Sequence, residues 1–248
     1  MKFLSKNLLS AGKMAIDCLF PKHCLGCQKE GTHLCPGCFD SLPISQSINC
    51  FVCGRRSPHG HACDSCRRQS HLKLDGLLVA SEWDNPLLKQ LIYAYKYSFV
   101  QELAAPLSMI IGEYLKVNFL DIEPRQEMVL ISVPLHPRRL AWRDFDQAEL
   151  LAKTVSQISS VPFAEKVLIR HRYTLPQADI HDQAARRSNI KNAFSLAKNY
   201  SPNSNPLKNK IIILVDDVAT TGATFQECVK VLKPLSPREI WGLVVARG

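Results

Sequence analysis

No run of apolar residues in this 248-residue chain approaches the roughly 20 residues that a membrane-spanning helix needs. Residues 1–20 have an amphipathic pattern, but Lys2, Lys6 and Lys13 interrupt the apolar segment that a secretory signal peptide requires. We therefore expect a cytoplasmic protein without an integral membrane segment. Residues 1–20 are predicted to form a helix that either docks on the body of the protein or binds a membrane surface or a partner.

Cysteine, by contrast, is abundant and regularly spaced. A Cys-x2-Cys pair directs two thiolates at one metal ion, and two such pairs complete a tetrahedral Zn2+ site. Regular pairs in a chain without a secretory signal favour metal over disulfides. We predict two structural zinc ions within residues 21–70, paired sequentially in the simplest arrangement, with an interleaved pairing left open. The predicted ligands are Cys24, Cys27, Cys35, Cys38, Cys50, Cys53, Cys63 and Cys66.

The zinc region is expected to support folding and not catalysis, because four thiolates close the coordination sphere of each ion. Metal replaces the core that the few apolar runs of this region cannot supply. Cys18 and Cys228 stand alone and are expected to be core residues. The neighbouring histidines are alternative ligands that eight thiols make unnecessary; they are His23, His33, His59 and His61.

Net charge restricts the partners only weakly. Lys and Arg number 31 against 22 Asp and Glu, which gives a formal charge of +9. Eight thiolates and two Zn2+ ions would add −8 + 4 = −4 and leave about +5. A mildly basic chain is compatible with nucleic acid or a polyphosphate ligand and is diagnostic of neither.

From about residue 71 onward, strand and helix patterns alternate, which predicts an α/β domain with a mostly parallel sheet flanked by helices. Pro86 near a helix start and the spacing of Asp146 and Glu149 mark two helix N-termini. Strands are predicted over residues 74–83, 128–133, 210–215 and 239–245. Helices are predicted over residues 86–97, 100–117 and 146–159 and after Thr224, with a surface loop over 199–209.

The segment 210–224 is the most informative. A run of branched apolar residues ends at Asp216 and Asp217, and a loop rich in hydroxyl groups and glycine then leads into a helical pattern. This order predicts a buried parallel strand followed by a phosphate-binding loop at a helix N-terminus. Gly222 lets the backbone approach a phosphate closely. Two adjacent acids fit ribose hydroxyls or a hard cation such as Mg2+. A ribose 5-phosphate carrying a metal-bound diphosphate would satisfy all these features.

The segment 212–224 resembles the phosphoribosyl-pyrophosphate (PRPP) motif of type I phosphoribosyltransferases. The resemblance implies that Asp216 and Asp217 contact ribose, that Mg2+ accompanies PRPP, and that the loop holds the 5′-phosphate. The loop residues are Ala219, Thr220, Thr221, Gly222, Ala223 and Thr224. Salvage enzymes for hypoxanthine carry an Asp where this chain has Thr220, which argues against that chemistry.

Basic residues elsewhere are candidates for diphosphate or DNA backbone, because guanidinium groups pair with phosphate in bidentate fashion. A solvated basic loop remains the alternative for the segment 138–143. We expect His136 to be structural and the tyrosines beside Lys96 to pack in the core, not to stack on bases. The basic candidates are Arg138, Arg139, Arg143, Arg186 and Lys96.

The order of these motifs from about residue 24 to residue 248 resembles the ComF family, which joins a double zinc ribbon to a type I phosphoribosyltransferase-like domain. The further motifs that carry the resemblance lie at residues 133–139, 143–151, 176–178, 186–189 and 193–194. One departure is that Asp144 and Asp146 stand where the family usually has Gly and Asn. These two acids are expected to reduce the positive charge near a diphosphate or DNA.

The resemblance implies three regions: a helix over 1–20, a double zinc ribbon over 21–70 and a phosphoribosyltransferase-like domain over 71–248. It also implies a role in DNA uptake during natural transformation, with single-stranded DNA, PRPP or a ribose phosphate, and a DNA-uptake helicase as candidate partners. The alternative is an active transferase that moves phosphoribose from PRPP to an unidentified acceptor. No general base or acceptor pocket stands out in the sequence.

Overall fold

The computed structural model describes residues 21–46, 49–57, 60–69, 73–118, 125–175, 180, 182–202 and 205–248. The predicted helix over 1–20, Cys18, His59 and the motif at 176–178 lie outside the described residues. No helix within the described residues is both long enough and apolar enough to cross a membrane.

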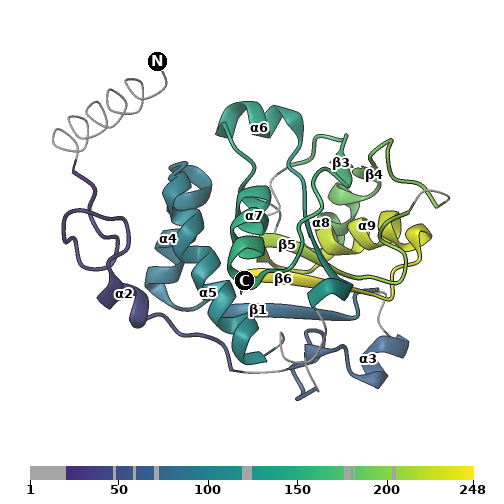
Figure 1. Ribbon diagram of the computed structural model, residues 1–248, viewed down its shortest axis with the longest axis horizontal. Helices are drawn as coiled ribbons and strands as arrows, with labels where there is room; N and C mark the ends of the chain where they lie inside the picture. The colour runs from purple at the N-terminus through teal and green to yellow at the C-terminus, as the bar shows by residue number, and fades with distance from the viewer. Residues whose placement is uncertain are drawn as a thin grey trace.

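A parallel sheet of four strands in the order β1-β6-β5-β2 forms the centre of the protein (Figure 1). The strands are β1 (Gly76–Glu82), β2 (Met128–Ser132), β5 (Ile211–Ala219) and β6 (Glu239–Arg247). They are almost continuously apolar because both faces of the sheet are buried. The α/β prediction with a parallel sheet is therefore confirmed.

Helices cover the two faces of this sheet. One face packs against α4 (Pro86–Tyr97), α5 (Ala104–Asn118) and α7 (Gln147–Ser159), and the other packs against α9 (Ala223–Leu232). Because strand side chains alternate, Ile213 and Val215 enter the first core and Ile212 and Leu214 the second.

The remaining elements surround these layers. The antiparallel two-stranded sheet of β3 (Leu168–Arg170) and β4 (Phe194–Leu196) lies with α8 (Gln183–Ile190) on the α9 side, and α6 (Pro137–Arg143) rises above the main sheet (Figure 1). Three short 3-10 turns are η2 (Gln101–Leu103), η3 (Arg125–Glu127) and η5 (Lys233–Leu235).

Local signals predicted several element boundaries correctly. The Asn85 side chain caps α4 by accepting from the Leu88 N–H, and Asp146 caps α7 by accepting from the Glu149 N–H. The predicted end of β5 was wrong, because the strand runs on to Ala219. Neither α6 nor the two-stranded sheet of β3 and β4 was predicted from the sequence.

The two cysteine clusters pack on opposite faces of the sheet. Cys24 and Leu34 belong to the core under α4 and α5, whereas Phe51 and Ala62 belong to the core under α9. Figure 1 shows the clusters apart, with α2 (Pro36–Asp40) beside α4 and α3 (Asp64–Gln69) below β1. Each cluster is thus continuous with the core of the body.

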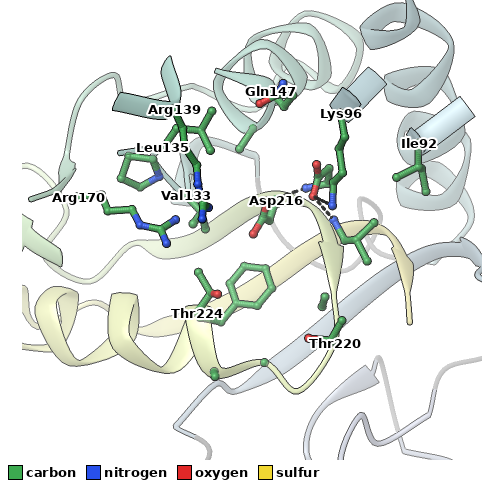
Figure 2. Close-up of a pocket in the computed structure, with 18 of the residues that line it drawn as sticks. Ile92, Lys96, Val133, Leu135, Arg139, Gln147, Arg170, Asp216, Thr220 and Thr224 are labelled. Atoms are coloured by element: carbon green, nitrogen blue, oxygen red, sulfur yellow. Dashed lines mark hydrogen bonds and ion pairs between the residues drawn. The ribbon is translucent and has the colours of Figure 1, made fainter. Parts of the chain in front are cut away.

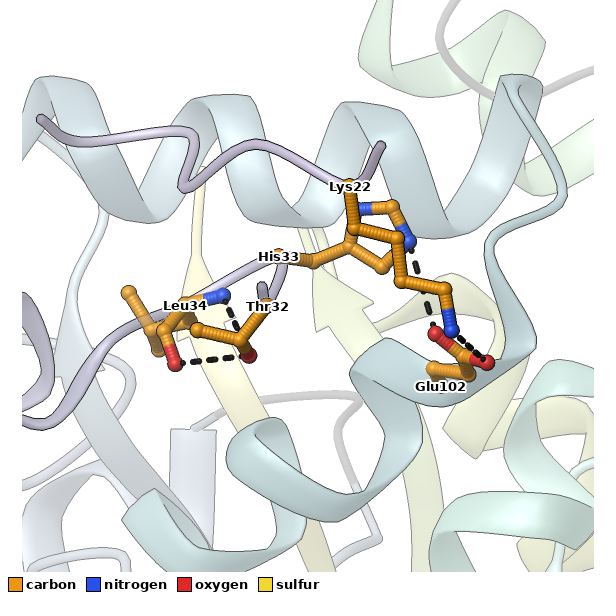
Figure 3. A network of polar contacts seen from close by, with 5 residues as sticks. All are labelled: Lys22, Thr32, His33, Leu34 and Glu102. Atoms are coloured by element: carbon orange, nitrogen blue, oxygen red, sulfur yellow. Dashed lines mark hydrogen bonds and ion pairs between the residues drawn. The ribbon is translucent and has the colours of Figure 1, made fainter. Parts of the chain in front are cut away.

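Polar contacts fasten the first cluster and cover the sheet edge. Glu102 at the start of η2 accepts a hydrogen bond from Lys22 Nζ at 2.6 Å and lies 3.5 Å from His33 Nε2 (Figure 3). The chain that leaves this cluster donates from Ser45 N to Ala80 O of β1 at 2.9 Å. This contact shields edge strand β1, which would otherwise present free backbone groups.

Candidate functional site

A cavity of about 220 Å3 opens at the carboxyl ends of β5 and β2 (Figure 2). This edge is where open parallel sheets bind ligands. The segment after β2, helices α4 and α6, and the start of α9 supply its walls. All the residues that the sequence assigned to PRPP line it, namely Asp216, Asp217, Ala219, Thr220, Thr221, Gly222, Ala223 and Thr224.

The two acids point to opposite faces of the sheet, because they are consecutive residues within β5. Asp217 faces α4, where its Oδ1 lies 2.9 Å from Lys96 Nζ. Burial alone would lower the pKa of Lys96, but the Asp217 carboxylate outweighs burial and raises it. Lys96 is therefore a charged partner of Asp217 in the cavity wall.

Asp216 faces the other side, where Arg139 and Arg170 lie (Figure 2). Burial raises the pKa of Asp216 from its usual 3.8 to about 8, and the charge of Asp217 adds to this effect while Lys96 opposes it. Asp216 enters no ion pair among the described residues. Its carboxylate is the acid of the cavity that remains available to a ligand.

The loop after β5 leads into α9, whose N-cap residue provides no side-chain cap; of the first N–H groups, that of Ala223 donates to Thr221 Oγ1 at 3.4 Å. Gly222 is the N-cap residue and has φ +74°, a conformation that glycine adopts without strain. Unpaired N–H groups and the helix dipole at such an N-terminus favour an anion. The loop predicted to bind phosphate thus lies at the N-terminus of α9, with Gly222 as the N-cap residue.

Three buried nitrogen atoms in the cavity wall have no hydrogen-bond partner within the described part of the chain. They are Arg143 Nε, Gln147 Nε2 and Arg170 Nε, and all three residues line the same cavity. Burying a polar group without a partner costs free energy, so such groups are rare in folded proteins. The three nitrogen atoms themselves are covered by protein, so their residues contribute to the cavity wall through other atoms.

Arg170 is the most unusual of these residues, because it is a buried cation. Burial and the neighbouring charge of Arg139 lower its pKa to about 10, and its Nη2 donates to Thr174 Oγ1. Neither Arg170 nor Gln147 was predicted from the sequence as a residue of the site. The only signal in the sequence is an arginine that closes the short apolar run 167–169.

The structure divides the basic candidates. Arg139, Arg143 and Lys96 line the cavity, whereas Arg138 and Arg186 do not. The Arg138 guanidinium lies 5.6 Å from the centre of the Tyr173 ring, and Arg186 Nε donates to Ile180 O at 2.6 Å. The segment 138–143 is a helix and not the loop considered as its alternative.

Other local predictions have mixed outcomes. His136 is structural, because it caps α6 by accepting from the Arg138 N–H at 3.2 Å. Tyr95 packs in the core as predicted and donates to Gln147 O. Tyr93 and Tyr97 were expected to pack as well, but they remain exposed at the mouth of the cavity.

The eight thiols of the Cys-x2-Cys pairs form two separate groups of four. Within each group the sulfur atoms lie within 4.8 Å of one another: Cys24, Cys27, Cys35 and Cys38 in the first cluster, and Cys50, Cys53, Cys63 and Cys66 in the second. The sequential grouping is therefore confirmed. Cys228 is buried in the core, as expected for an unpaired cysteine.

Each group fits a tetrahedral zinc ion. A Zn–S distance of about 2.3 Å implies sulfur atoms about 3.8 Å apart. Cys27 and Cys35 Sγ lie 3.6 Å apart, and Cys53 and Cys63 Sγ lie 3.7 Å apart. Burial opposes ionisation of Cys24, but backbone N–H donors lower its pKa to about 6, which suits a thiolate ligand.

The histidines near the clusters that the structure describes are not part of either four-sulfur group. His33 contacts Glu102, His23 lies 3.7 Å from Glu30, and the His61 ring packs at 4.4 Å from the Trp241 ring. These three histidines therefore contact the surrounding protein, as expected with eight thiols available.

Comparison with known proteins bears on both parts of the chain. A family profile described as "Double zinc ribbon domain" matches residues 15–67. Competence protein F of Haemophilus influenzae is 30% identical over 233 residues, which cover 90% of this chain and 96% of that protein. The chain belongs to the ComF family.

Two further similarities extend this result. The DNA utilization protein YhgH of Escherichia coli O157:H7 is 30% identical to this ComF protein over 204 residues, 80% of this chain and 83% of that one. The solved glutamine PRPP amidotransferase of B. subtilis, complexed with ADP and GMP, has 16% identity and a TM-score of 0.37. It covers 62% of this chain and 30% of its own. At this TM-score the second likeness supports no argument.

Asp144 and Asp146, the two acids that depart from the ComF pattern, both lie at the ends of helices. Asp144 ends α6 with φ +66°, a left-handed conformation that explains the glycine usual in the family. Asp146 accepts from Leu135 N at 2.7 Å and from Glu149 N at 3.1 Å, which ties the segment after β2 to the start of α7. Neither acid lines the cavity, so the expected loss of positive charge does not fall on its wall.

The raised pKa of Asp216 predicts how the stability of this ComF protein depends on pH. A carboxyl whose pKa is higher in the folded than in the unfolded state stabilises the fold while protonated, and this contribution is lost as pH rises from about 4 to about 8. The Tm advantage of Asp216→Asn over the wild type should therefore grow between pH 5 and pH 8 by about 8–16 °C, from roughly 4 kcal/mol at about 1.4 kcal/mol per pH unit and roughly 2–4 °C per kcal/mol.

Thermal unfolding of both proteins at several pH values without ligand checks this expectation. Asp84→Asn is the matched control, because Asp84 is fully exposed in an ion pair with Lys89. Its Tm difference from the wild type should stay flat over the same range. A flat difference for Asp216→Asn as well would show that the Asp216 carboxyl is not destabilised by burial.

Proposed function

We propose that this ComF protein acts in DNA uptake during natural competence, binds single-stranded DNA, and holds PRPP or a ribose 5-phosphate in the cavity at the end of β5. The observation that carries the ligand part is the cavity at the end of β5, where Asp216, Asp217 and the loop 219–224 meet the basic residues Arg139, Arg143 and Arg170. The names of the relatives, Competence protein F and DNA utilization protein, support the DNA part.

The chemistry of the cavity suggests one orientation for PRPP. The 5′-phosphate would lie against the loop 219–224 at the N-terminus of α9, where N–H groups favour an anion. The ribose hydroxyls would face Asp216 and Asp217. The diphosphate would lie toward Arg139, Arg143 and Arg170, whose guanidinium groups suit phosphate oxygens.

Mg2+ fits this arrangement through its usual donor set. It binds proteins through one or two carboxylates together with substrate phosphates and waters. Within the described residues, Asp217 is paired with Lys96 and Asp216 forms no ion pair. Asp216 is therefore the carboxylate of the cavity that best suits Mg2+. When bound, the ion would neutralise charge on the diphosphate.

The second candidate function is an active transferase that moves phosphoribose from PRPP to an amine or another nucleophile. The pair Asp216 and Asp217 together with the complete loop favours it. Release of diphosphate from PRPP in the presence of candidate acceptors separates the two functions. A binding protein leaves PRPP intact over hours, whereas a transferase releases one diphosphate per ribose transferred.

Single-stranded DNA should bind with strong salt dependence. If Arg138, Arg139 and Arg143 each contact a phosphate, the slope of log K against log salt should be about −2, from roughly 0.7 per contact. Affinity for an oligo(dT) strand should then fall more than about tenfold between 50 and 200 mM salt. Fluorescence anisotropy with labelled oligo(dT) measures it, and the absence of binding at 50 mM salt would remove DNA from the proposal.

A further inference from the structure

Helix α6 stands above the cavity without a buried face. None of its seven residues is buried, and both Leu140 and Trp142 are exposed. An isolated helix this short is not stable in water, and helices in proteins are usually stabilised by packing an apolar face. The outward side of α6 therefore has the composition of a contact surface.

Exposed aromatic rings gather around this helix. Among the described residues, four aromatic side chains are more than 40% exposed, and they are Tyr93, Tyr97, Trp142 and Tyr173. The ring centres of Tyr93 and Tyr97 lie 5.6 Å apart, and Trp142 packs edge-on to Phe99 at 5.0 Å. Much of the surface of these rings is therefore exposed to solvent, and the rings lie around the same helix.

Arginines of α6 lie between the rings. The Arg143 guanidinium is 5.8 Å from the Tyr97 ring and 5.9 Å from the Trp142 ring. Arg138 and Arg139 lie 5.6 and 5.7 Å from the Tyr173 ring. Residues 133–143 contain no Asp or Glu, and the exposed Asp144 at the end of α6 is the nearest acid along the chain.

We propose that these residues form the surface on which this ComF protein binds single-stranded DNA, with bases stacked on the rings and phosphates paired with the arginines. We call it the α6 platform, and it consists of Tyr93, Tyr97, Arg138, Arg139, Trp142, Arg143 and Tyr173. The inference rests on the proposed DNA function and gives that function its surface. Aromatic rings within a basic surface are the usual means of holding a single strand without sequence preference.

The chemistry of the platform favours a single strand over other anionic partners. A duplex keeps its base faces stacked internally and so could not use the flat rings. An acidic peptide would pair with the arginines but would leave the rings without stacking partners. An anionic bilayer prefers a continuous apolar face, whereas here guanidinium groups separate the rings.

Substitution at Trp142 and Tyr173 tests the proposal, because neither residue lines the cavity. Trp142→Ala with Tyr173→Ala should weaken oligo(dT) binding by about tenfold or more, since each stacked base depends on its ring. Trp142→Phe with Tyr173→Phe keeps the rings and should bind within about twofold of the wild type. Both double variants should retain the Tm shift with PRPP, which shows that the fold is intact.

Trp142 also provides a spectroscopic signature of stacking. The chain has three tryptophans. Trp142 is exposed, Trp83 is half-buried and Trp241 is buried. Oligo(dT) should quench the fluorescence of the wild type. The quenching should disappear in Trp142→Phe although the DNA still binds.

The outcomes separate the surface from the function. If the wild type binds no single-stranded DNA, the DNA function fails and the platform with it. If the wild type binds and the double Ala variant binds equally well, only the platform is overturned. Loss of DNA binding in Arg67→Gln with Arg68→Gln, but not in the double Ala variant, would assign the DNA to the second cysteine cluster. If the double Ala variant loses binding to phosphatidylglycerol vesicles but still binds oligo(dT) like the wild type, the platform is a membrane-binding surface and not a DNA-binding one.

Discussion

Replacing Arg170 with methionine should weaken PRPP binding by at least about 30-fold without lowering the stability of the free protein. Removing one partner of a buried charged hydrogen bond costs roughly 2–5 kcal/mol of binding free energy. In the free protein, Arg170 is buried beside Arg139 and its Nε has no partner among the described residues. Methionine fills similar space without the charge. The Tm of the free variant should therefore equal or exceed that of the wild type.

Arg172→Met is the matched control for this prediction. Arg172 is exposed, lies two residues further along the chain, and donates to the backbone oxygens of Ser188 and Asn189 outside the cavity. Calorimetric titration of each variant with PRPP and Mg2+ should show affinity close to the wild type for Arg172→Met only. Unchanged affinity in Arg170→Met would mean that the buried guanidinium does not serve a ligand.

Removal of zinc by a strong chelator should lower the Tm by more than about 10 °C. Zinc binding supplies folding free energy in small metal domains, and each kcal/mol corresponds to roughly 2–4 °C in a chain of this size. Here Cys24 and Phe51 are part of the two main hydrophobic cores, so loss of either metal exposes core residues of the body. Thermal unfolding before and after chelation measures this effect.

Metal analysis of single variants then tests how the thiols are grouped. The wild type should contain two zinc ions per chain. Cys24→Ser should retain one, because its cluster lies on the opposite face of the sheet from Cys50 and its partners. Cys228→Ala, a buried cysteine outside both clusters, should retain two. Loss of both ions in Cys24→Ser would contradict the sequential grouping.

The sequence predicted the features that depend on neighbours along the chain. Cysteine pairs, the strand–loop–helix around Gly222, the helix start at Pro86 and the cap at Asp146 are local, and the structure contains them all. The parallel sheet follows from alternating strand and helix patterns. Membership of the ComF family, which the resemblance indicated, is confirmed.

The sequence could not predict what the tertiary fold brings together. Arg170 reaches the cavity from the end of β3 and Gln147 reaches it from the first turn of α7, and no spacing in the chain links them to Asp216. Asp216 and Asp217 point in opposite directions because both lie within β5, which runs to Ala219. The sequence had placed the end of this strand at residue 215, before both acids. Helix α6 was missed because a short, arginine-rich segment without buried residues has no apolar periodicity.

The most direct measurement is the change in Tm that PRPP and Mg2+ produce in the wild type and in Asp216→Ala with Asp217→Ala, each compared with its own ligand-free value. At 100 times Kd, a ligand stabilises the folded state by about 2.7 kcal/mol, which corresponds to roughly 5–10 °C here. We expect this rise in the wild type and none in the double variant. An equal rise in both proteins, or no rise in the wild type at millimolar PRPP, would contradict a phosphoribosyl site at the end of β5.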